Sequence, residues 1–459
     1  MASTFSGIST ALSGLYAARR GLDVAGQNIA NANTEGYSRQ RLSLQSVGGS
    51  TVPAMYAIDP GIGNGVAVRG VDRLRSSFLE ARARVEHTQN AYLTALREAY
   101  VRIEDVFAEP SDTSLQALLA DFWAGWDDVA NHPGDLAARS QLVQRGSVVA
   151  DGLRAAYEGL NSQWRTLRTQ TEAYVRDVNE SAAAVAQLNQ TIKRAEAAGM
   201  VVNELADERD MHLIKLAQLI GATAVWRDDG TVDVLVDGST LVSGGSARQL
   251  EVVGAEQISD ATSNPVVLRW ADTKTPVTPG GALGAMSELL GEILPGFAAA
   301  LDEVAATLAD TVNAQHMVGY DVDGGTGRPF FTGNTASTIA VAVTEREVAV
   351  ASAPGTVDGS NAAKLAELGK LTDGADALYR KLVVDLGVAA LATNRRAEIQ
   401  AQVTANVDAA RLAEAGVNLD EEMINLLASQ RAYEAAARVL TTVDSMLDTL
   451  INRTGLVGR

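Results

Sequence analysis

The sequence predicts a mainly α-helical protein with a smaller β module, in which coiled-coil helices at the two ends of the chain pair with each other. The first observation is a seven-residue apolar repeat near the N-terminus: Phe5, Ile8, Leu12, Leu15, Leu22 and Ile29. The second is the same repeat near the C-terminus: Leu419, Met423, Leu426, Tyr433, Leu440, Leu447 and Ile451. The third is that all ten prolines, which break helices, lie between Pro53 and Pro354. Such narrow apolar stripes bury themselves against a partner helix instead of covering a globular core.

The N-terminal helix is expected over residues 5–30, ending at Asn28, Asn31 and Asn33 and closing at Gly36, because Asn and Gly form turns at low cost. Its interior contains glycines at positions 7, 14, 21 and 26, and each costs about 1 kcal/mol relative to alanine. Three of them recur every seven residues beside the apolar stripe, which would let another backbone approach closely. We therefore expect a helix that is mostly unfolded alone and becomes ordered against neighbours.

Elongated helical hairpins are expected next, after two short strands at residues 41–47 and 65–71. Helices are predicted over residues 74–107, 139–198 and 204–220. Pro110 ends the first of these, and Ser111, Asp112 or Thr113 can cap another helix that contains Phe122, Trp123 and Trp126 as core residues. A helix over 283–317 is expected to kink near Pro295, and 317–360 to form turns and strands.

A β module is predicted over residues 223–282. Asp228-Asp229-Gly230 precedes Val232, Val234 and Val236, whose alternation with polar residues indicates a hairpin with an Asp-Gly turn. From Lys364 the chain is predicted to be helical to its end, with a break near Gly416. Asn418 can cap the last helix, and Glu421 stands three residues later, where it would complete a capping box.

Composition excludes several classes of function. The net charge of −18 would repel phosphate backbones, so no nucleic-acid partner is expected. The absence of cysteine removes disulfides, thiolate nucleophiles and cysteine-ligated zinc. The first thirty residues do not contain the contiguous apolar core of a signal peptide, and no stretch approaches the length of a membrane-spanning helix. We expect neither membrane insertion nor a cleaved leader.

No catalytic residue, metal ligand or cofactor is predicted. The four histidines, at positions 87, 132, 212 and 316, are not at metal-ligand spacing and are interpreted as helix-surface or turn residues. Asp321-Val322-Asp323-Gly324 begins like a calcium loop, but Thr332 stands where the loop needs Glu, so a turn is expected. Asp207, Glu208 and Asp210 are interpreted as the solvated face of a helix. The chain is therefore not expected to be an enzyme.

Both ends of the chain resemble a known family. Ser13-Gly14-Leu15, Leu22-Asp23-Val24 and the run from Asn28 to Tyr37 resemble the N-terminal signature of bacterial flagellar rod, hook and hook-associated proteins. The continuation Ser38-Arg39-Gln40 is similar to that of the hook-associated protein 1 (FlgK) family. Residues 416–422, 430–439 and 446–451 resemble the C-terminus of the same family. The resemblance is weakest in residues 223–280 and 318–360.

The resemblance implies a structural subunit of the flagellum at the junction between hook and filament. Its partners would be copies of itself in a helical ring, the hook protein, the second hook–filament junction protein, and a cytosolic export chaperone that holds the C-terminal helix. It would be extracellular, exported by the flagellar type III apparatus. Its terminal helices would order by coupled folding and binding when neighbouring subunits supply apolar surface.

Domain boundaries and site residues follow from the same reasoning. We expect a terminal coiled-coil domain from residues 1–60 and 404–459, an elongated helical domain from 61–222 and 283–403, and an outer β-rich domain at 223–282. The predicted assembly interface comprises residues of both apolar stripes and of the Asn- and Gly-containing turn after the first: Phe5, Ile8, Leu12, Leu15, Leu22, Asn28, Ile29, Asn31, Asn33, Gly36, Tyr37, Leu419, Met423, Leu426, Leu427, Tyr433, Leu440, Leu447, Leu450 and Ile451.

Three alternatives stay open at this point. The chain could be another axial component of the flagellum, such as the second junction protein or a hook-like subunit. It could be a secreted hydrolase of cell-wall or other glycans, which would need paired carboxylates about 5 to 10 Å apart that the sequence does not nominate. A coiled-coil adhesin would need heptads through the middle of the chain, where the β module interrupts them.

Overall fold

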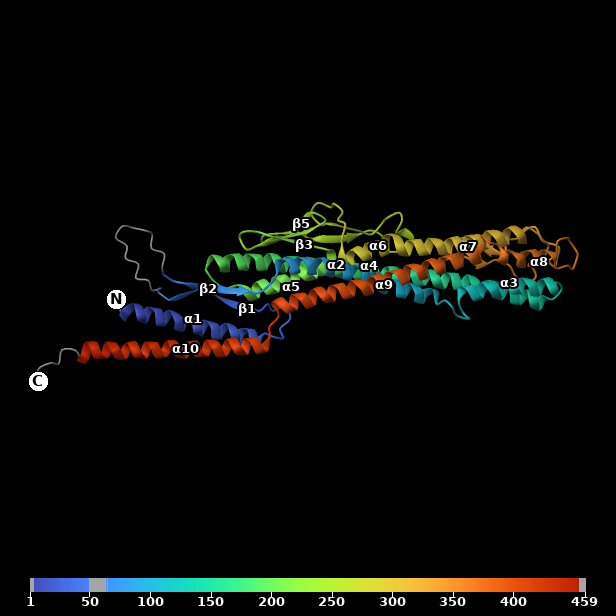
Figure 1. The fold of residues 1–459 in the computed structure, drawn as a ribbon. Helices are drawn as coiled ribbons and strands as arrows, with labels where there is room; N and C mark the ends of the chain where they lie inside the picture. The colour runs from blue at the N-terminus through green and yellow to red at the C-terminus, as the bar shows by residue number, and fades with distance from the viewer. Residues whose placement is uncertain (1–3, 49–62, 64, 454–459) are drawn as a thin grey trace, which may run out of the picture.

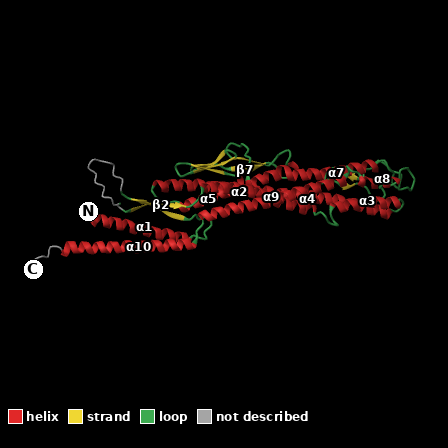
Figure 2. Cartoon of the chain, in the orientation of Figure 1, coloured by secondary structure: helices red, strands yellow, loops and turns green. Residues whose placement is uncertain are grey.

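The computed structural model describes residues 4–48, 63 and 65–453 of the chain. The molecule is elongated: long helices run side by side along one axis, and the first and the last described helices lie together at one end (Figure 1). Short strands form a layer on one flank of the helices and a small sheet near the termini (Figure 2). This arrangement confirms the predicted fold class, mainly α-helical with a small β module.

The terminal helices pair as predicted. Helix α1 (Thr4–Ala30) packs along α10 (Leu419–Asp448), and the two run antiparallel (Figure 1). A π-helical turn, Thr449–Arg453, follows α10. Beside α1 lies an antiparallel pair of strands, β1 (Gln40–Ser46) and β2 (Val66–Arg73), with a bulge between Ser43 and Leu44.

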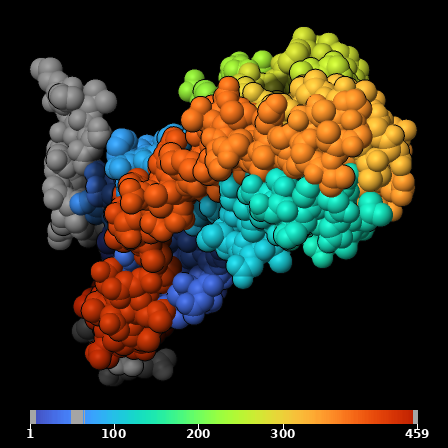
Figure 3. Space-filling view, turned by 90° about the vertical axis from the view of Figure 1, so that its right-hand side faces the viewer, coloured from blue at the N-terminus to red at the C-terminus, as the bar shows by residue number. Residues whose placement is uncertain are grey.

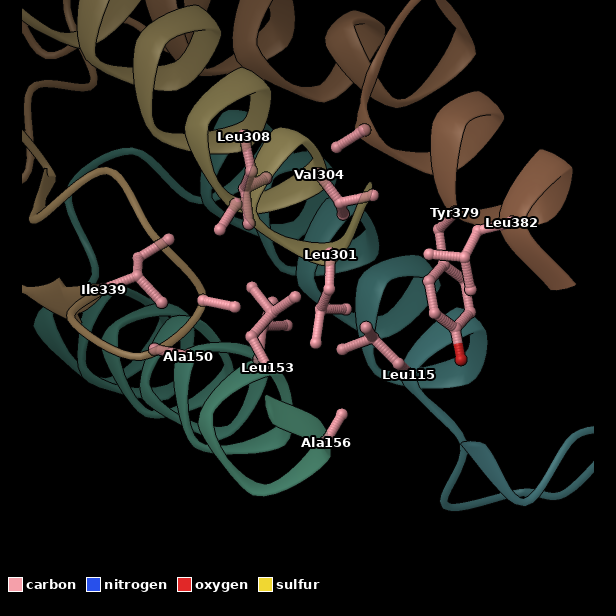
Figure 4. Packing of buried hydrophobic residues seen from close by; sticks show 14 of the residues in the cluster. Leu115, Ala150, Leu153, Ala156, Leu301, Val304, Leu308, Ile339, Tyr379 and Leu382 are labelled. Carbon is pink, nitrogen blue, oxygen red and sulfur yellow. The ribbon is translucent and has the colours of Figure 1, made fainter. Parts of the chain in front are cut away.

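The body is a bundle of long helices with two apolar cores. Its helices are α2 (Ser77–Phe107), α3 (Leu115–Asn131), α4 (Leu136–Ala197), α5 (Asn203–Ile220), α6 (Gly281–Glu288), α7 (Leu294–His316), α8 (Ser360–Glu367) and α9 (Ala375–Ala415). One core lies among the helices, and the other lies between α4, α5 and the strands that follow α5. Leu115, Leu153, Leu301 and Tyr379 meet in the first core from α3, α4, α7 and α9 (Figure 4). The predicted core residues Phe122, Trp123 and Trp126 are buried there.

The β module lies against the middle of the long helices. Strands β3 (Thr223–Trp226), β4 (Val232–Val236), β5 (Ser239–Ser243) and β6 (Ser246–Ala247) form one antiparallel sheet, and β7 (Leu250–Val253) pairs with β8 (Val267–Trp270). A short 3-10 turn, Ile258–Asp260, lies between the last two. The alternating valines of β4 are fully buried against α4 and α5, which confirms the predicted hairpin.

Several predicted boundaries are wrong by a few residues. Helix α3 begins after Ser114, not after Ser111, Asp112 or Thr113, and Ser114 makes no side-chain capping bond. Helix α10 does begin at the Asn418 cap, whose side chain accepts from the amides of Asp420 and Glu421. The Glu421 side chain, however, pairs with Arg39, so it does not serve the predicted capping box.

Two long predicted helices are interrupted. The segment expected over 283–317 contains a π-helical turn, Leu289–Ile293, immediately before Pro295; proline lacks an amide hydrogen and its ring crowds the preceding turn, which widens the helix there. The C-terminal helical region breaks between α8 and α9, where Leu368–Lys370 forms a 3-10 turn, as well as near Gly416. Residue 404, the predicted boundary of the terminal domain, lies inside α9.

The distal end of the body contains a buried histidine that the sequence did not reveal. His316 closes α7 beside two short strands, β9 (Phe331–Thr332) and β10 (Ala340–Val341), and is 1 % exposed, so its interpretation as a surface residue is wrong. Its Nδ1 lies 2.7 Å from the carbonyl oxygen of Arg328, and its Nε2 accepts the amide of Ala349 at 2.9 Å. These bonds select the neutral ring, and burial lowers the pKa of His316.

This geometry predicts a pH-dependent loss of stability. Because the folded pKa of His316 lies below its ordinary value near 6.5, the unfolded chain takes up a proton first as the pH falls. The stabilisation is complete above about pH 6.5 and declines below it by at most about 1.4 kcal/mol per pH unit. Chemical denaturation between pH 7.5 and 5 should show a shallower decline for His316→Asn than for the wild type. His132→Asn, at an exposed helix end, should keep the wild-type slope; equal slopes for all three proteins would contradict the assignment.

Candidate assembly interface at the terminal helices

The side of α1 that packs on α10 contains small residues. Ala11, Ala18 and Ala25 are buried, and a Cβ placed on Gly21 would lie 2.7 Å from the Ser429 hydroxyl oxygen. These positions recur every seven residues or at steps of three and four, so they share one side of the helix. The close approach predicted for the glycines is therefore confirmed at Gly21. A Cβ on Gly7 or Gly14 would have no neighbour within 4 Å.

The predicted stripe residues divide into two groups. Those that are half-buried are Ile8, Leu15, Leu22, Ile29, Leu426, Leu440 and Leu447. Those that are exposed are Leu12, Leu419, Met423, Leu427, Tyr433, Leu450 and Ile451, with fractional exposures from 37 to 73 %. The side chain of Phe5 lies outside the described residues. On α10, Glu422 and Ser429 contact α1. The helical period places four stripe residues on that same side: Leu426, Tyr433, Leu440 and Leu447. This part of the stripe therefore faces the partner helix.

Asn28 is the polar centre of the junction between the terminal pair and the strands. Its side chain is 1 % exposed and makes four hydrogen bonds. The amide nitrogen donates to the Gln40 carbonyl oxygen at 2.9 Å and to Oε2 of Glu422 at 3.0 Å. The amide oxygen accepts from the Tyr37 hydroxyl at 2.8 Å and from the Gln40 backbone amide at 2.9 Å. An amide group has two donors and two acceptor sites, so Asn28 is fully satisfied, and it joins α1, β1 and α10.

Arg39 connects the two ends of the chain a second time. Its Nε donates to Oε1 of Glu422 and its Nη1 to Oε2 of Glu421, both at 2.7 Å. Its backbone amide donates to the carbonyl oxygen of Ala415, at the end of α9. The Glu422 side chain is 3 % exposed, so this carboxylate is stabilised by Arg39 and Asn28 instead of by water.

A further ion-pair cluster holds the strands against the body. Arg73, at the end of β2, donates to Asp207 at 2.7 Å and to Asp210 at 2.9 Å, and Arg75 also pairs with Asp210. Asp207 accepts the Ser38 amide as well. Burial lowers the pKa of Arg73, but the two carboxylates offset that effect, and its pKa lies above the ordinary value. The interpretation of Asp207 and Asp210 as a solvated face is therefore wrong; Glu208 is exposed as expected.

The turn between α1 and β1 has a shape that requires its glycine. Gly36 has a φ of +78°, and a Cβ there would lie 2.5 Å from the Met211 sulfur. Asn31 bonds within the turn, to the Gln27 carbonyl oxygen and the Thr34 hydroxyl, whereas Asn33 is exposed. Burial, together with the nearby carboxylates of Glu204, Asp207 and Glu422, raises the pKa of Tyr37 to about 12, so its hydroxyl stays protonated and donates to Asn28.

The residues missed by the sequence reasoning are the charged ones. Arg39 and Glu422 lay inside the family-like motifs but were not assigned to the interface, and Gln40, Arg73, Asp207 and Asp210 were not assigned either. These residues pair with segments far apart in the chain, and the spacing of apolar residues within one segment does not indicate such pairs. Among the described residues no group of three or more histidine, cysteine or acidic side chains could hold a metal ion, and no helix there is long and apolar enough to cross a membrane.

Comparison with known proteins assigns the family. The model of the flagellar hook-associated protein FlgK helical domain matches residues 100–331, just over half of the chain. The chain belongs to the FlgK family. Both ends match further flagellar families: residues 8–37 match the flagella basal body rod protein, and residues 409–453 match the C-terminal region of the basal body rod FlgEFG proteins. The resemblance seen in the sequence is thereby confirmed.

Individual relatives agree with this assignment. The chain is 29 % identical to flagellar hook-associated protein 1 of Bacillus subtilis over the full length of both. It is 30 % identical to flagellar hook-associated protein 1 of Salmonella typhimurium, over 71 % of this chain and 59 % of that protein, so it spans well under two thirds of this relative. The structure of the flagellar hook junction protein FlgK from Burkholderia pseudomallei superposes with a TM-score of 0.63 at 16 % identity, covering 72 % of this chain and 99 % of that one, which shows the shared fold.

The Asn28 geometry predicts a strong effect of one substitution. Asn28→Ala removes one of the two partners of the buried Glu422 carboxylate and leaves the Gln40 backbone and the Tyr37 hydroxyl without a buried partner, which should destabilise the paired terminal helices by about 2 to 5 kcal/mol. Flagella isolated from cells with limiting expression should then contain the variant at less than about a tenth of the wild-type amount, since 1.4 kcal/mol corresponds to a factor of ten. Asn33→Ala, at an exposed position of the same turn, should be incorporated normally. Equal incorporation of both variants would contradict the role given to Asn28.

Proposed function

We propose that this chain is a structural subunit of the bacterial flagellum at the hook–filament junction, and that its terminal helices order fully only on assembly. Membership of the FlgK family supports the location. The observation that supports the assembly mechanism is the amount of apolar surface left uncovered on α10: Leu419, Met423, Ile424 and Leu427 are each at least half exposed within three turns. An exposed stripe of that kind is unusual on a soluble monomer and favours a partner surface.

The terminal pair depends little on the body for its burial. On the face of the molecule shown in Figure 3, the red C-terminal helix projects away from the body. Within α10, only Glu422 is fully buried, whereas the helices of the body have many buried apolar residues. A two-helix pair whose large apolar side chains are only half-buried or exposed buries too little apolar area to offset its loss of conformational entropy, so neighbouring subunits would supply the rest.

The proposal includes the partners and the export route that the family implies. Copies of this chain would form a helical ring that contacts hook protein on one side and the second junction protein on the other. Export would use the flagellar type III apparatus, with a cytosolic chaperone on α10 beforehand; the exposed apolar residues of α10 support such protection. The location is extracellular, in the flagellum, and no cofactor or catalytic activity is proposed.

We further propose that the chain has three domains. The terminal domain would contain residues 1–60 and the C-terminal helix, the elongated domain 61–222 and 283–403, and the outer domain 223–282. Residues 404–415 continue α9 and bond to α2, through Thr404 to Glu86 and through Arg411 to Glu80. This favours a boundary at residues 416–418 instead of 404.

The location is tested in a deletion strain. Cells without the chain should build hooks that lack filaments and should not swim, and the restored chain should be labelled by immunogold between hook and filament. Labelling along the hook or along the filament would instead identify another axial component.

The assembly mechanism predicts a pattern of hydrogen exchange in the verified monomer. Residues 1–40 and 420–459 should exchange without protection, whereas residues 74–220, which include the buried faces of α2, α3, α4 and α5, should be protected. Strong protection at both ends of the monomer would contradict coupled folding and binding.

The paired face of α10 predicts the effect of added charge. Leu440 and Leu447 are half-buried on that face, and changing both to aspartate places two charges in an apolar contact. Leu440→Asp with Leu447→Asp should abolish filament attachment, scored by electron microscopy and swimming. The matched control is Val225→Asp with Val357→Asp, two exposed valines in the β module and in the loop before α8, and it should swim normally. Normal filaments on the first variant would argue against the interface.

A further inference from the structure

A groove lies beside the terminal helix pair. It has a volume of about 540 Å³ and is lined mainly by small and apolar side chains of three elements, among them Ala18, Gly21 and Ala25 of α1, Leu42 and Leu44 of β1, and Ala428 of α10. Three of its polar residues are bonded to other parts of the chain: Arg39 and Asn425 to Glu422, and Gln40 to Glu204. The groove thus presents a mainly apolar surface.

The opposite side of α10 carries projecting apolar side chains instead of a groove. Met423, Ile424 and Leu427 are 52, 66 and 50 % exposed and lie within about one turn and a half. Exposed Asp420 lies about one turn before Met423 on the same side. Asn425, Ser429 and Ala432, which line the groove, point to the other side of the helix according to the helical period. One helix therefore borders a hollow on one side and presents three large apolar side chains on the other.

The charges of the two surfaces are complementary. Exposed Arg41 of β1 lines the groove, and exposed Arg20 of α1 flanks it, three and four residues from the lining residues Ala17 and Val24. Helix α10 contains six acidic residues and two arginines. Opposite charges at an apolar contact favour one orientation of the partners and disfavour the like-charged alternatives.

We propose that the groove of one copy receives the outer face of α10 from a second copy, with Met423, Ile424 and Leu427 inserted between α1, β1 and α10. This rests on the proposed function and extends it, because it assigns which surfaces of neighbouring copies meet. The two surfaces are different and lie on opposite sides of α10, so the contact is heterologous. A heterologous contact repeats from copy to copy and generates a ring or a helix instead of a closed two-fold dimer. The groove is continuous with the α1–α10 contact, so its filling would also stabilise that pair.

The absence of cysteine from the chain permits a direct test. Leu44→Cys, in the groove wall, and Leu427→Cys, on the outer face, are produced as two separate chains in cells that lack the wild type. Isolated flagella are then oxidised, and the two chains are distinguished by different tags. We expect a disulfide-linked pair that contains one chain of each kind. Leu44→Cys combined with Val357→Cys, at the far end of the body, should give no such pair.

Each outcome bears on one of the two proposals. Chains present in flagella without the 44–427 disulfide, or linked 427 to 427, would overturn the docking proposal while leaving the proposed function intact. Absence of the wild-type chain from flagella would overturn both. A second variant guards against disturbed folding: Ala428→Leu fills the groove and should lower incorporation at least tenfold, whereas Ala435→Leu, an exposed position on the same helix outside the groove, should not. Equal incorporation of these two would also overturn the docking proposal.

Discussion

The structure depends on one buried contact, in which the Asn28 amide meets the Glu422 carboxylate across almost the whole length of the sequence. The amide has no spare donor or acceptor, and the carboxylate is nearly inaccessible to water. Such a pair contributes less through net attraction than through the cost of any arrangement that leaves it unpaired. It therefore fixes the register of α1 on the antiparallel α10: Gly21, seven residues before Asn28, meets Ser429, seven residues after Glu422.

The overall organisation was predictable because it rests on periodicity. Proline-free ends with matched apolar repeats predicted the terminal pair, and the alternation of Val232, Val234 and Val236 predicted a strand whose valines are buried. Asn418 was a correct cap because its side chain can reach the amides of the next turn whatever surrounds it. These features depend on neighbours within a few residues.

The predictions failed where a distant neighbour decides the outcome. Asp207 and Asp210 look like surface residues until Arg73 and Arg75 arrive from β2. His316 is buried because the segments at Arg328 and Ala349 close over it. None of these partners can be recognised from the local sequence. The assembly-interface assignments themselves are still predictions.

The long helices of the body differ in stiffness from the neck, the two short segments at residues 74–76 and 416–418 that connect the terminal pair and its strands to the body. This difference has a mechanical consequence. Helix α4 alone has 62 residues and therefore extends about 93 Å, and α9, which packs on α2 and α7, has 41 residues. Packed rods of that length resist bending, whereas the terminal pair is tied to them by two short connections and a few ion pairs at Arg39, Arg73 and Arg75. A torque applied to the molecule would therefore deform the neck first, and the neck would act as a flexible joint between the terminal helix pair and the helical body.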